Sequence, residues 1–240
     1  MFYIYAVTIF LSSALLFLVQ PMMGKLLSPF FGGAASVWLT CLMFFQCLLL
    51  AGYSLSHFFI KKISSNKQKT IVVILLSMAL LQSLYLYFNH GSENIPDLGW
   101  PQLNIILALL IFIGISFFSL SVLSPTLQYW MGGQNPYKLY IMSNLGCLLS
   151  LVLYPTFIEY YFSLDVQFLI FALLYSVLFF LVTYLSLNLK IKVEVKKSFK
   201  LKMSQKIFWF WLSMASTVVM MGQTQYLSSL LLPIPLLWVV

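Results

Sequence analysis

The chain has 240 residues, of which 62% are hydrophobic and 8% are charged, and its formal net charge is +8. Soluble domains carry about 25% charged residues, so the composition excludes an ordinary soluble domain and predicts that most apolar side chains face lipid or other spans. All thirteen basic residues are lysines, which excludes bidentate guanidinium recognition of phosphate and argues against a nucleic-acid partner.

Seven apolar windows reach the length of about 20 residues that a helix needs to cross the hydrocarbon core. The first, Phe2–Val19, has no basic leader or cleavage site, which indicates a retained span rather than a signal peptide. The final run, 231–240, begins an eighth window but is too short to span, so the chain is expected to stop inside a span. The sequence predicts an all-α integral membrane protein with one polytopic helical bundle over 1–240, about seven full transmembrane helices and a partial eighth. The seven windows are 2–20, 34–60, 70–88, 102–124, 137–158, 164–189 and 207–230.

Gln20 and Pro21 interrupt the first apolar run, and Lys25 follows them. Irregular polar backbone at membrane depth is tolerated only beside protein or water, so this segment predicts a helix break and a polar pathway. The stretch from Pro125 to Gln128 predicts a second break, and Gln20 and Gln128 are candidate members of one shared pathway. Lys25 either lines a polar vestibule or pairs with a carboxylate, or it is an interfacial lysine that reaches the headgroups.

Two amide side chains, Gln46 and Asn144, fall in the middle of their windows. Amides at that depth are expected to face the bundle and to bond across helices. A structural role between helices is favoured, and contact with a solute in the polar pathway is the alternative.

Four weaker candidates lie near span ends. His57 is either a proton relay or an interfacial histidine without a chemical role. Glu159 either attracts cations or terminates a span in water. Trp38 and Tyr137 either contribute to an aromatic cation site or anchor the chain at the membrane interface.

Lysines and acidic residues alternate between the predicted loops. Lysines fill the loops after the second, fourth and sixth windows, whereas acidic residues occupy the other loops. Because cytoplasmic loops are enriched in lysine, the N-terminus is predicted to be cytoplasmic, with Lys25 as the exception on the outer side. The acidic residues in the other loops are Glu93, Asp97, Glu159 and Asp165, and the loop lysines are Lys61, Lys62, Lys67, Lys69, Lys138, Lys190, Lys192, Lys196, Lys197, Lys200, Lys202 and Lys206.

Residues 100 positions apart match at several places. Each unit would contain three spans, which is an odd number, so successive units would be inverted across the membrane, as in many transporters. The sequence predicts repeat-like units at 1–100, 101–200 and an incomplete 201–240, with chance similarity among apolar helices as the alternative. The matches are Gly32-Gly33 with Gly132-Gly133, Cys47-Leu48-Leu49 with Cys147-Leu148-Leu149, Leu27 with Leu127, and Leu39 with Leu139.

Nothing in the sequence has the spacing of a catalytic triad, a metal site or a phosphate loop. No catalytic residue, no metal and no other cofactor is therefore predicted. The three cysteines lie within apolar runs and are expected to pack as small hydrophobic side chains.

Five ordered segments carry a resemblance. LVQPMMGKLLSPFFGG (18–33), VWLTCLMFFQCLLLAGYSLSH (37–57), PTLQYW (125–130), NPYKLYIMSNLGCLLSLVLYP (135–155) and IPLLWV (234–239) are together similar to the membrane half of the fused transporter-like (MFS-like)/spermidine-synthase-like proteins of bacteria. That family usually has an arginine where this chain has Tyr129. The resemblance implies a transporter-like bundle in the bacterial inner membrane and a link to polyamine chemistry.

The resemblance also implies a soluble spermidine-synthase-like (aminopropyltransferase) domain as a partner. This chain has no Gly-rich nucleotide loop and only five acidic residues, so no enzymatic activity is expected in it. The leading function is a transporter-like domain, surrounded by the lipid bilayer, that handles a small cationic or amphipathic solute. The alternatives are a membrane anchor or scaffold for a spermidine-synthase-like domain missing from this chain, and a truncated inactive remnant.

Overall fold

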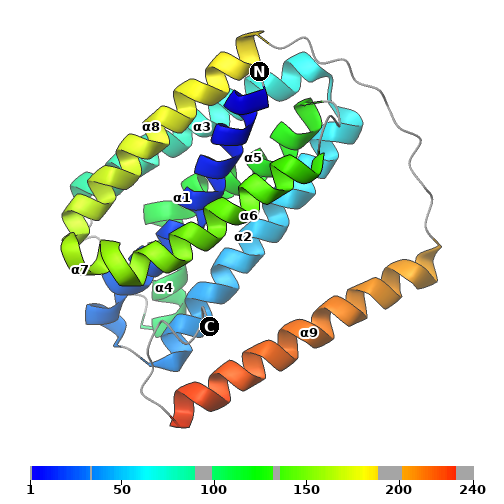
Figure 1. Cartoon of the computed structure of the whole chain (residues 1–240). Coiled ribbons are helices and arrows are strands. Elements are labelled where there is room, and N and C mark those ends of the chain that lie inside the picture. The colour runs from blue at the N-terminus through cyan, green and yellow to red at the C-terminus, as the bar shows by residue number, and fades with distance from the viewer. Residues whose placement is uncertain (1, 33, 90–98, 132–135, 189–201, 231–240) are drawn as a thin grey trace.

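The computed structural model describes residues 2–32, 34–89, 99–131, 136–188 and 202–230, and every regular element in these ranges is helical. Six helices are long and apolar enough to cross a membrane, which confirms the predicted all-α class and indicates a multi-pass membrane protein. Figure 1 shows α1 to α8 as a bundle, with α9 lying apart from it. The elements are α1 (Phe2–Phe31), α2 (Ala35–Lys62), α3 (Ser65–Asn89), α4 (Pro101–Leu109), the π-helical segment η2 (Leu110–Gly114), α5 (Ile115–Trp130), α6 (Pro136–Leu153), the π-helical segment η3 (Tyr154–Ile158), α7 (Glu159–Tyr161), α8 (Leu164–Asn188) and α9 (Met203–Leu230).

The first six predicted windows each fall on one of these six apolar helices, counting α4–η2–α5 and α6–η3–α7 as one span each. The seventh window, 207–230, falls on α9, which is not among the six and whose described side chains, apart from Met221, are exposed. The closing run 231–240 lies outside the described residues. The structure therefore supports six apolar spans within the described ranges, and a seventh span stays a prediction.

The predicted helix breaks at Gln20–Pro21 and at Pro125–Gln128 are wrong. Pro21 lies inside the continuous helix α1, and Pro125 lies inside α5. A proline removes one backbone donor, and a helix in a membrane bundle can continue through it because neighbouring helices and Ser/Thr side chains satisfy the backbone groups that it frees. α1 ends only at Phe31, where Gly32 adopts a φ of 78° and its N–H donates to the carbonyl of Ser28 at 2.9 Å.

Two long spans form the centre of the bundle. The apolar windows of α1 and of α4–η2–α5 are 56% and 67% buried, whereas no other span exceeds 39%. α1 packs against α6, α8, α5 and α2, while α5 packs against α2 and α3, and α3 packs against α8 (Figure 1). The remaining helices thus surround α1 and α5.

The two largest helix–helix contacts each combine a glycine with a pair of hydroxyl groups. In the α1–α6 contact, a Cβ added at Gly146 would lie 2.5 Å from the backbone oxygen of Phe10, and Ser13 and Ser143 share a 2.7 Å hydrogen bond. In the α2–α5 contact, a Cβ at Gly52 would overlap the Ser121 side chain. Ser56 and Thr126 share a 2.9 Å hydrogen bond across the same contact. Small residues allow close backbone approach, and hydroxyl pairs bond across it.

The π-helical segment η2 is completed by a glutamine from a neighbouring helix. Gln82 of α3 donates its side-chain N–H groups to the carbonyl oxygens of Leu110 and Ile111, both at 2.9 Å. Its side-chain oxygen accepts the backbone N–H of Ser116 at 2.8 Å. A π-helical turn leaves backbone groups that the regular pattern would pair, and Gln82 satisfies three of them.

Two of the turns between helices are built in the same way. Between α2 and α3, the side-chain amide of Gln68 donates to the carbonyl of Ile63 at 2.7 Å. Between α7 and α8, the side-chain amide of Gln167 donates to the carbonyl of Phe162 at 2.9 Å. Both glutamines are buried, and each side-chain amide donates to the residue five positions earlier in the chain. The backbone N–H of each glutamine donates to the carbonyl of a serine four positions earlier, Ser64 or Ser163. Each also accepts a bond from an aromatic side chain: Trp130 to Gln68 at 3.1 Å and Tyr154 to Gln167 at 3.2 Å.

Candidate functional site

An ion pair joins the C-terminal part of α1 to the start of α7. The Nζ atom of Lys25 lies 3.7 Å from a carboxylate oxygen of Glu159, and the two side chains are 35% and 45% exposed. Chain segments 134 residues apart are thereby brought together, so the sequence alone named both residues but not their contact. Pairing with a carboxylate was one of the roles expected for Lys25, and the structure contains this pair. The role of the pair in a pathway stays a prediction.

An apolar cavity lies next to this ion pair. Its volume is about 270 Å³, and α1, the α6–η3 segment and α8 supply its walls. Leu18, Met22 and Lys25 follow one another at helical spacings of four and three residues, so they share one face of α1. Glu159 directly follows the η3 part of the wall. The lining residues are Leu18, Met22, Leu153, Phe157, Ile158, Phe162, Gln167 and Ile170, here called the α1–α8 pocket.

The single polar side chain in this wall is already bonded within the protein. Gln167 donates to the carbonyl of Phe162 and accepts the hydroxyl of Tyr154, as described for the α7–α8 turn. The α1–α8 pocket therefore offers hydrocarbon surface, and the charged groups lie only at its rim. Gln167 was not identified from the sequence, although the spacing from Ser163 to Gln167 repeats that from Ser64 to Gln68 and could have marked it.

Two further sequence candidates belong to the same end of α1. The side chain of Gln20 is half-buried and bonds its own helix, donating to the carbonyl of Leu16 at 3.5 Å. The ring of Trp38 packs against the backbone of α1 at Gly24, where an added Cβ would overlap the ring. Gln20, Lys25, Trp38 and Glu159 thus gather around the end of α1 that precedes α2.

The mid-span amides do not face the bundle, and that prediction was wrong. Gln46 on α2 and Asn144 on α6 are both exposed. The hydroxyl of the neighbouring Ser143, one residue before Asn144, makes the contact across helices instead. Both helices are apolar around most of their circumference, so the sequence did not indicate which of their faces would turn inward.

The remaining candidates lie elsewhere. Gln128 is half-buried near the end of α5, two residues before Trp130, which bonds Gln68 in the α2–α3 turn. α2 has 28 residues and separates this turn from the Lys25 region by about 40 Å. His57 and Tyr137 are both exposed, on the last turns of α2 and the first turn of α6. The predicted single polar pathway through Gln20, Lys25, Gln46, Gln128 and Asn144 is therefore not assembled in this structure.

No group of three metal-binding side chains occurs among the residues that the structure describes. Cys41 is buried, Cys147 is half-buried and Cys47 is exposed. Comparison of the chain with protein-family models, with curated proteins and with solved structures finds no match. What the chain does is therefore inferred from its helix packing and from the chemistry around Lys25 and Glu159.

Proposed function

We propose that this chain is a transporter-like membrane domain that moves a small cationic or amphipathic solute across a bacterial inner membrane. The observation that carries the proposal is the way the helices pack in two matching sets of three spans. The first unit is residues 2–89 (α1 to α3), and the second unit is residues 101–188 (α4 to α8).

Exchanging the two units leaves the pattern of helix contacts unchanged. In this exchange α1 corresponds to α5, α2 to α6 and α3 to α8. The contact of α1 with α6 then corresponds to that of α5 with α2, and the contact of α1 with α8 corresponds to that of α5 with α3. The contacts α1–α5 and α3–α8 each map onto themselves. Such a pattern supports a two-fold relation between the units, and units of three spans related in this way are inverted in the membrane. Inverted repeats of this kind are characteristic of secondary transporters.

Matched residues fall on matched helices. Leu27 and Leu127 are both buried, on α1 and α5. Cys47 and Cys147 lie on α2 and α6. Gln68 and Gln167, 99 positions apart, lie in the first turns of α3 and α8, and each donates to a carbonyl at the end of the preceding helix. The matched glycine pairs involve residues 33, 132 and 133, which lie outside the described residues. The residue matches support the same two units as the packing.

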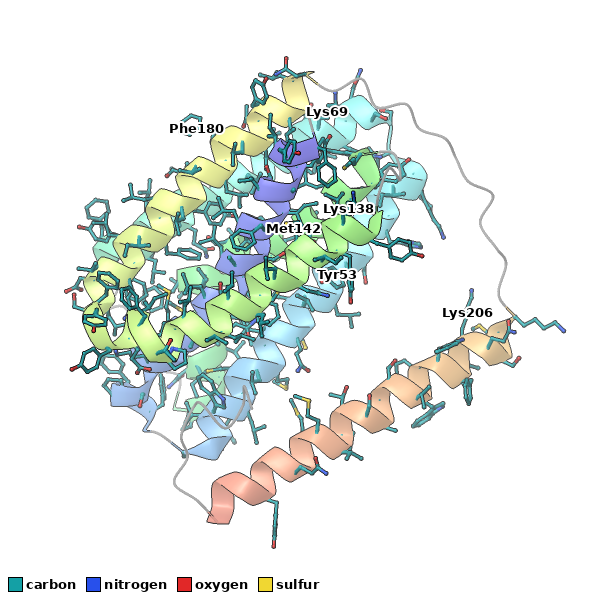
Figure 2. All side chains as sticks on the ribbon, viewed as in Figure 1. Tyr53, Lys69, Lys138, Met142, Phe180 and Lys206 are labelled. Carbon is teal, nitrogen blue, oxygen red and sulfur yellow. The ribbon has the colours of Figure 1, made fainter. Side chains whose placement is uncertain are left out.

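The distribution of charge supports a cytoplasmic N-terminus. The α2–α3 turn carries Lys61, Lys62, Lys67 and Lys69, whereas the α7–α8 turn carries Glu159 and Asp165. Figure 2 shows Lys69 and Lys138 at the end of the bundle where the chain begins. Lysine-rich ends face the cytoplasm in most membrane proteins. The lysines at 190, 192, 196, 197 and 200 lie outside the described residues.

Flux through the purified protein tests the proposal. The full chain is reconstituted into vesicles, and uptake is measured for spermidine as a cationic probe and for lysophosphatidylethanolamine as an amphipathic one. Protein-dependent uptake of either probe is expected. Uptake of lysophosphatidylethanolamine, whose phosphate can pair with a lysine, should be lost in Lys25→Ala and retained in Lys138→Ala, a change at an exposed lysine near the other end. If neither probe is moved by a protein that inserts normally, the transporter proposal fails. The anchor role for a spermidine-synthase-like domain, implied by the family resemblance, would then lead.

A further inference from the structure

We propose that the Lys25–Glu159 pair and the α1–α8 pocket form one binding site for a zwitterionic membrane lipid of the phosphatidylethanolamine type. The lipid phosphate would bind Lys25, its primary ammonium would bind Glu159, and one alkyl chain would occupy the pocket. This inference rests on the proposed function and names the class of amphipathic molecule that the site takes.

The charges of the site select a ligand that carries both signs. Lys25 and Glu159 lie 3.7 Å apart and are 35% and 45% exposed, so neither is enclosed by the other. A lysine ammonium has three donors and a carboxylate has two acceptor oxygens, which leaves each group able to bind a second partner. A polyamine would gain Glu159 but would be repelled by Lys25. A purely anionic headgroup would meet the opposite conflict, whereas a phosphate next to an ammonium satisfies both residues.

The ammonium must carry N–H groups. A carboxylate is an acceptor of hydrogen bonds, and its strongest partners are charged donors. The primary ammonium of an ethanolamine headgroup donates such bonds, while the quaternary ammonium of a choline headgroup has no N–H to donate. Glu159 therefore distinguishes ethanolamine from choline, and Lys25 alone would not.

The pocket accepts hydrocarbon and little else. Its volume of about 270 Å³ lies just below the range of about 300–1,000 Å³ typical of sites that enclose a whole drug-sized ligand. Gln167, the polar residue in its wall, is bonded to Phe162 and Tyr154. The pocket is therefore suited to part of one alkyl chain, with the headgroup outside it.

The geometry matches a lipid in its membrane orientation. Leu18 in the pocket wall precedes Lys25 by seven residues, which places it about 10 Å further along the helix. Lys25 and Glu159 lie near the ends of their apolar spans, at the level where headgroups meet the hydrocarbon core. A lipid with its phosphate on Lys25 would thus extend its chain along α1 into the pocket. Since lipid tails are apolar in the surrounding bilayer as well, selectivity depends on the two charged residues.

Native mass spectrometry of the full chain in detergent tests this site. Phosphatidylethanolamine, phosphatidylcholine and phosphatidylglycerol with the same chains are titrated in competition. Wild-type protein is expected to retain phosphatidylethanolamine at least about tenfold better than either other lipid, the effect of one charge-assisted hydrogen bond. Glu159→Gln should abolish the preference over phosphatidylcholine, while Lys25→Gln should weaken binding of all three. Glu159→Asp should retain part of the preference, and Lys138→Gln should match wild type.

Equal retention of the three lipids by wild-type protein would overturn the inference, as would an unchanged preference in both Lys25→Gln and Glu159→Gln. Thermal unfolding of each variant in the same detergent shows whether the variant is folded, and Leu153→Trp, which fills the pocket without touching either charge, should lower retention of all three lipids. A preference for phosphatidylethanolamine without flux of any probe would sink the transporter proposal and leave the lipid site standing. Flux without a lipid preference would overturn the lipid site and leave the transporter proposal standing.

Discussion

The first unit (residues 2–89) and the second unit (residues 101–188) share one packing plan but differ in their helices and charges. Each contributes a glycine to a close helix contact, Gly52 or Gly146. In each unit a buried glutamine of the last helix, Gln68 or Gln167, donates to a carbonyl at the end of the helix before it. The second unit alone contains π-helical segments, and its turn is acidic where that of the first unit is rich in lysine.

The difference at the central spans has a local cause. The segment Leu110–Gly114 is π-helical, whereas the corresponding segment of α1, 100 positions earlier, is regular α-helix. Facing the π-helical segment is Gln82 of α3, whose side chain bonds its free backbone groups. At the spacing of 99 residues that pairs Gln68 with Gln167, Gln82 corresponds to Leu181 of α8, which is apolar and half-buried. Packing is thus repeated between the units, while a single polar side chain determines whether an irregular helix is tolerated.

The largest expected effect comes from making the first unit resemble the second at this position. Gln82→Leu would leave the carbonyls of Leu110 and Ile111 and the N–H of Ser116 without their side-chain partner. At about 1–3 kcal/mol for each of these three buried groups, the free energy of unfolding should fall by about 3 kcal/mol or more. Unfolding by SDS titration in mixed micelles measures it. Gln46→Leu, the same change at an exposed glutamine, is the control and should cost almost nothing; an equal loss in both variants would contradict the role given to Gln82.

The two close contacts should differ in how they can be rescued. Gly146→Ala forces a Cβ to within 2.5 Å of the Phe10 backbone oxygen, and overpacking of this kind costs about 1–3 kcal/mol. Gly52→Ala should cost a similar amount, because its Cβ would overlap the side chain of Ser121. Adding Ser121→Gly should restore stability in the second case, since it removes the overlapping atoms, and no side-chain deletion can do so in the first.

Gly222→Ala is the matched control for both glycine variants. An added Cβ there has no atom within 4 Å, so the variant should be as stable as wild type in thermal unfolding. The contact geometry would be wrong if Gly146→Ala were equally stable.

Replacing the two buried glutamines, Gln68 and Gln167, should lower the free energy of unfolding by unequal amounts. Gln68→Leu leaves the buried indole N–H of Trp130 without an acceptor and should cost about 1–3 kcal/mol. Gln167→Leu should cost about 1 kcal/mol, because the hydroxyl of Tyr154 can rotate towards another partner. A double-mutant cycle with Trp130→Phe isolates the bond, because the phenyl ring has no N–H to leave unpaired. Additive losses in that cycle would show that the bond contributes nothing.

The smallest effects are expected at the paired hydroxyl groups. Ser13→Ala removes the bond to Ser143 in the α1–α6 contact, and Ser56→Ala removes the bond to Thr126 in the α2–α5 contact. Hydrogen bonds between membrane helices average about 0.6 kcal/mol, so each variant should lose about that amount in SDS titration. Clearly different losses would mean that the two contacts are not equivalent, which would weaken the two-unit interpretation.

The sequence by itself determined the all-helical class, the positions of six apolar spans and the alternation of basic and acidic turns. These properties depend on the length and composition of single segments, because a span needs about 20 apolar residues whatever it packs against. The sequence also identified Lys25 and Glu159 as unusual, since each is a charged side chain at the margin of an apolar run.

Only the tertiary structure decided which polar side chains turn inward. Gln46 and Gln82 both lie within apolar runs, yet Gln46 is exposed and Gln82 completes a π-helical turn. A helix that is apolar all round has no stripe to mark its buried face, so its orientation is set by its neighbours. For the same reason, the continuity of α1 through Pro21 and the contact between Lys25 and Glu159 depend on packing between distant segments, which no local pattern of residues records.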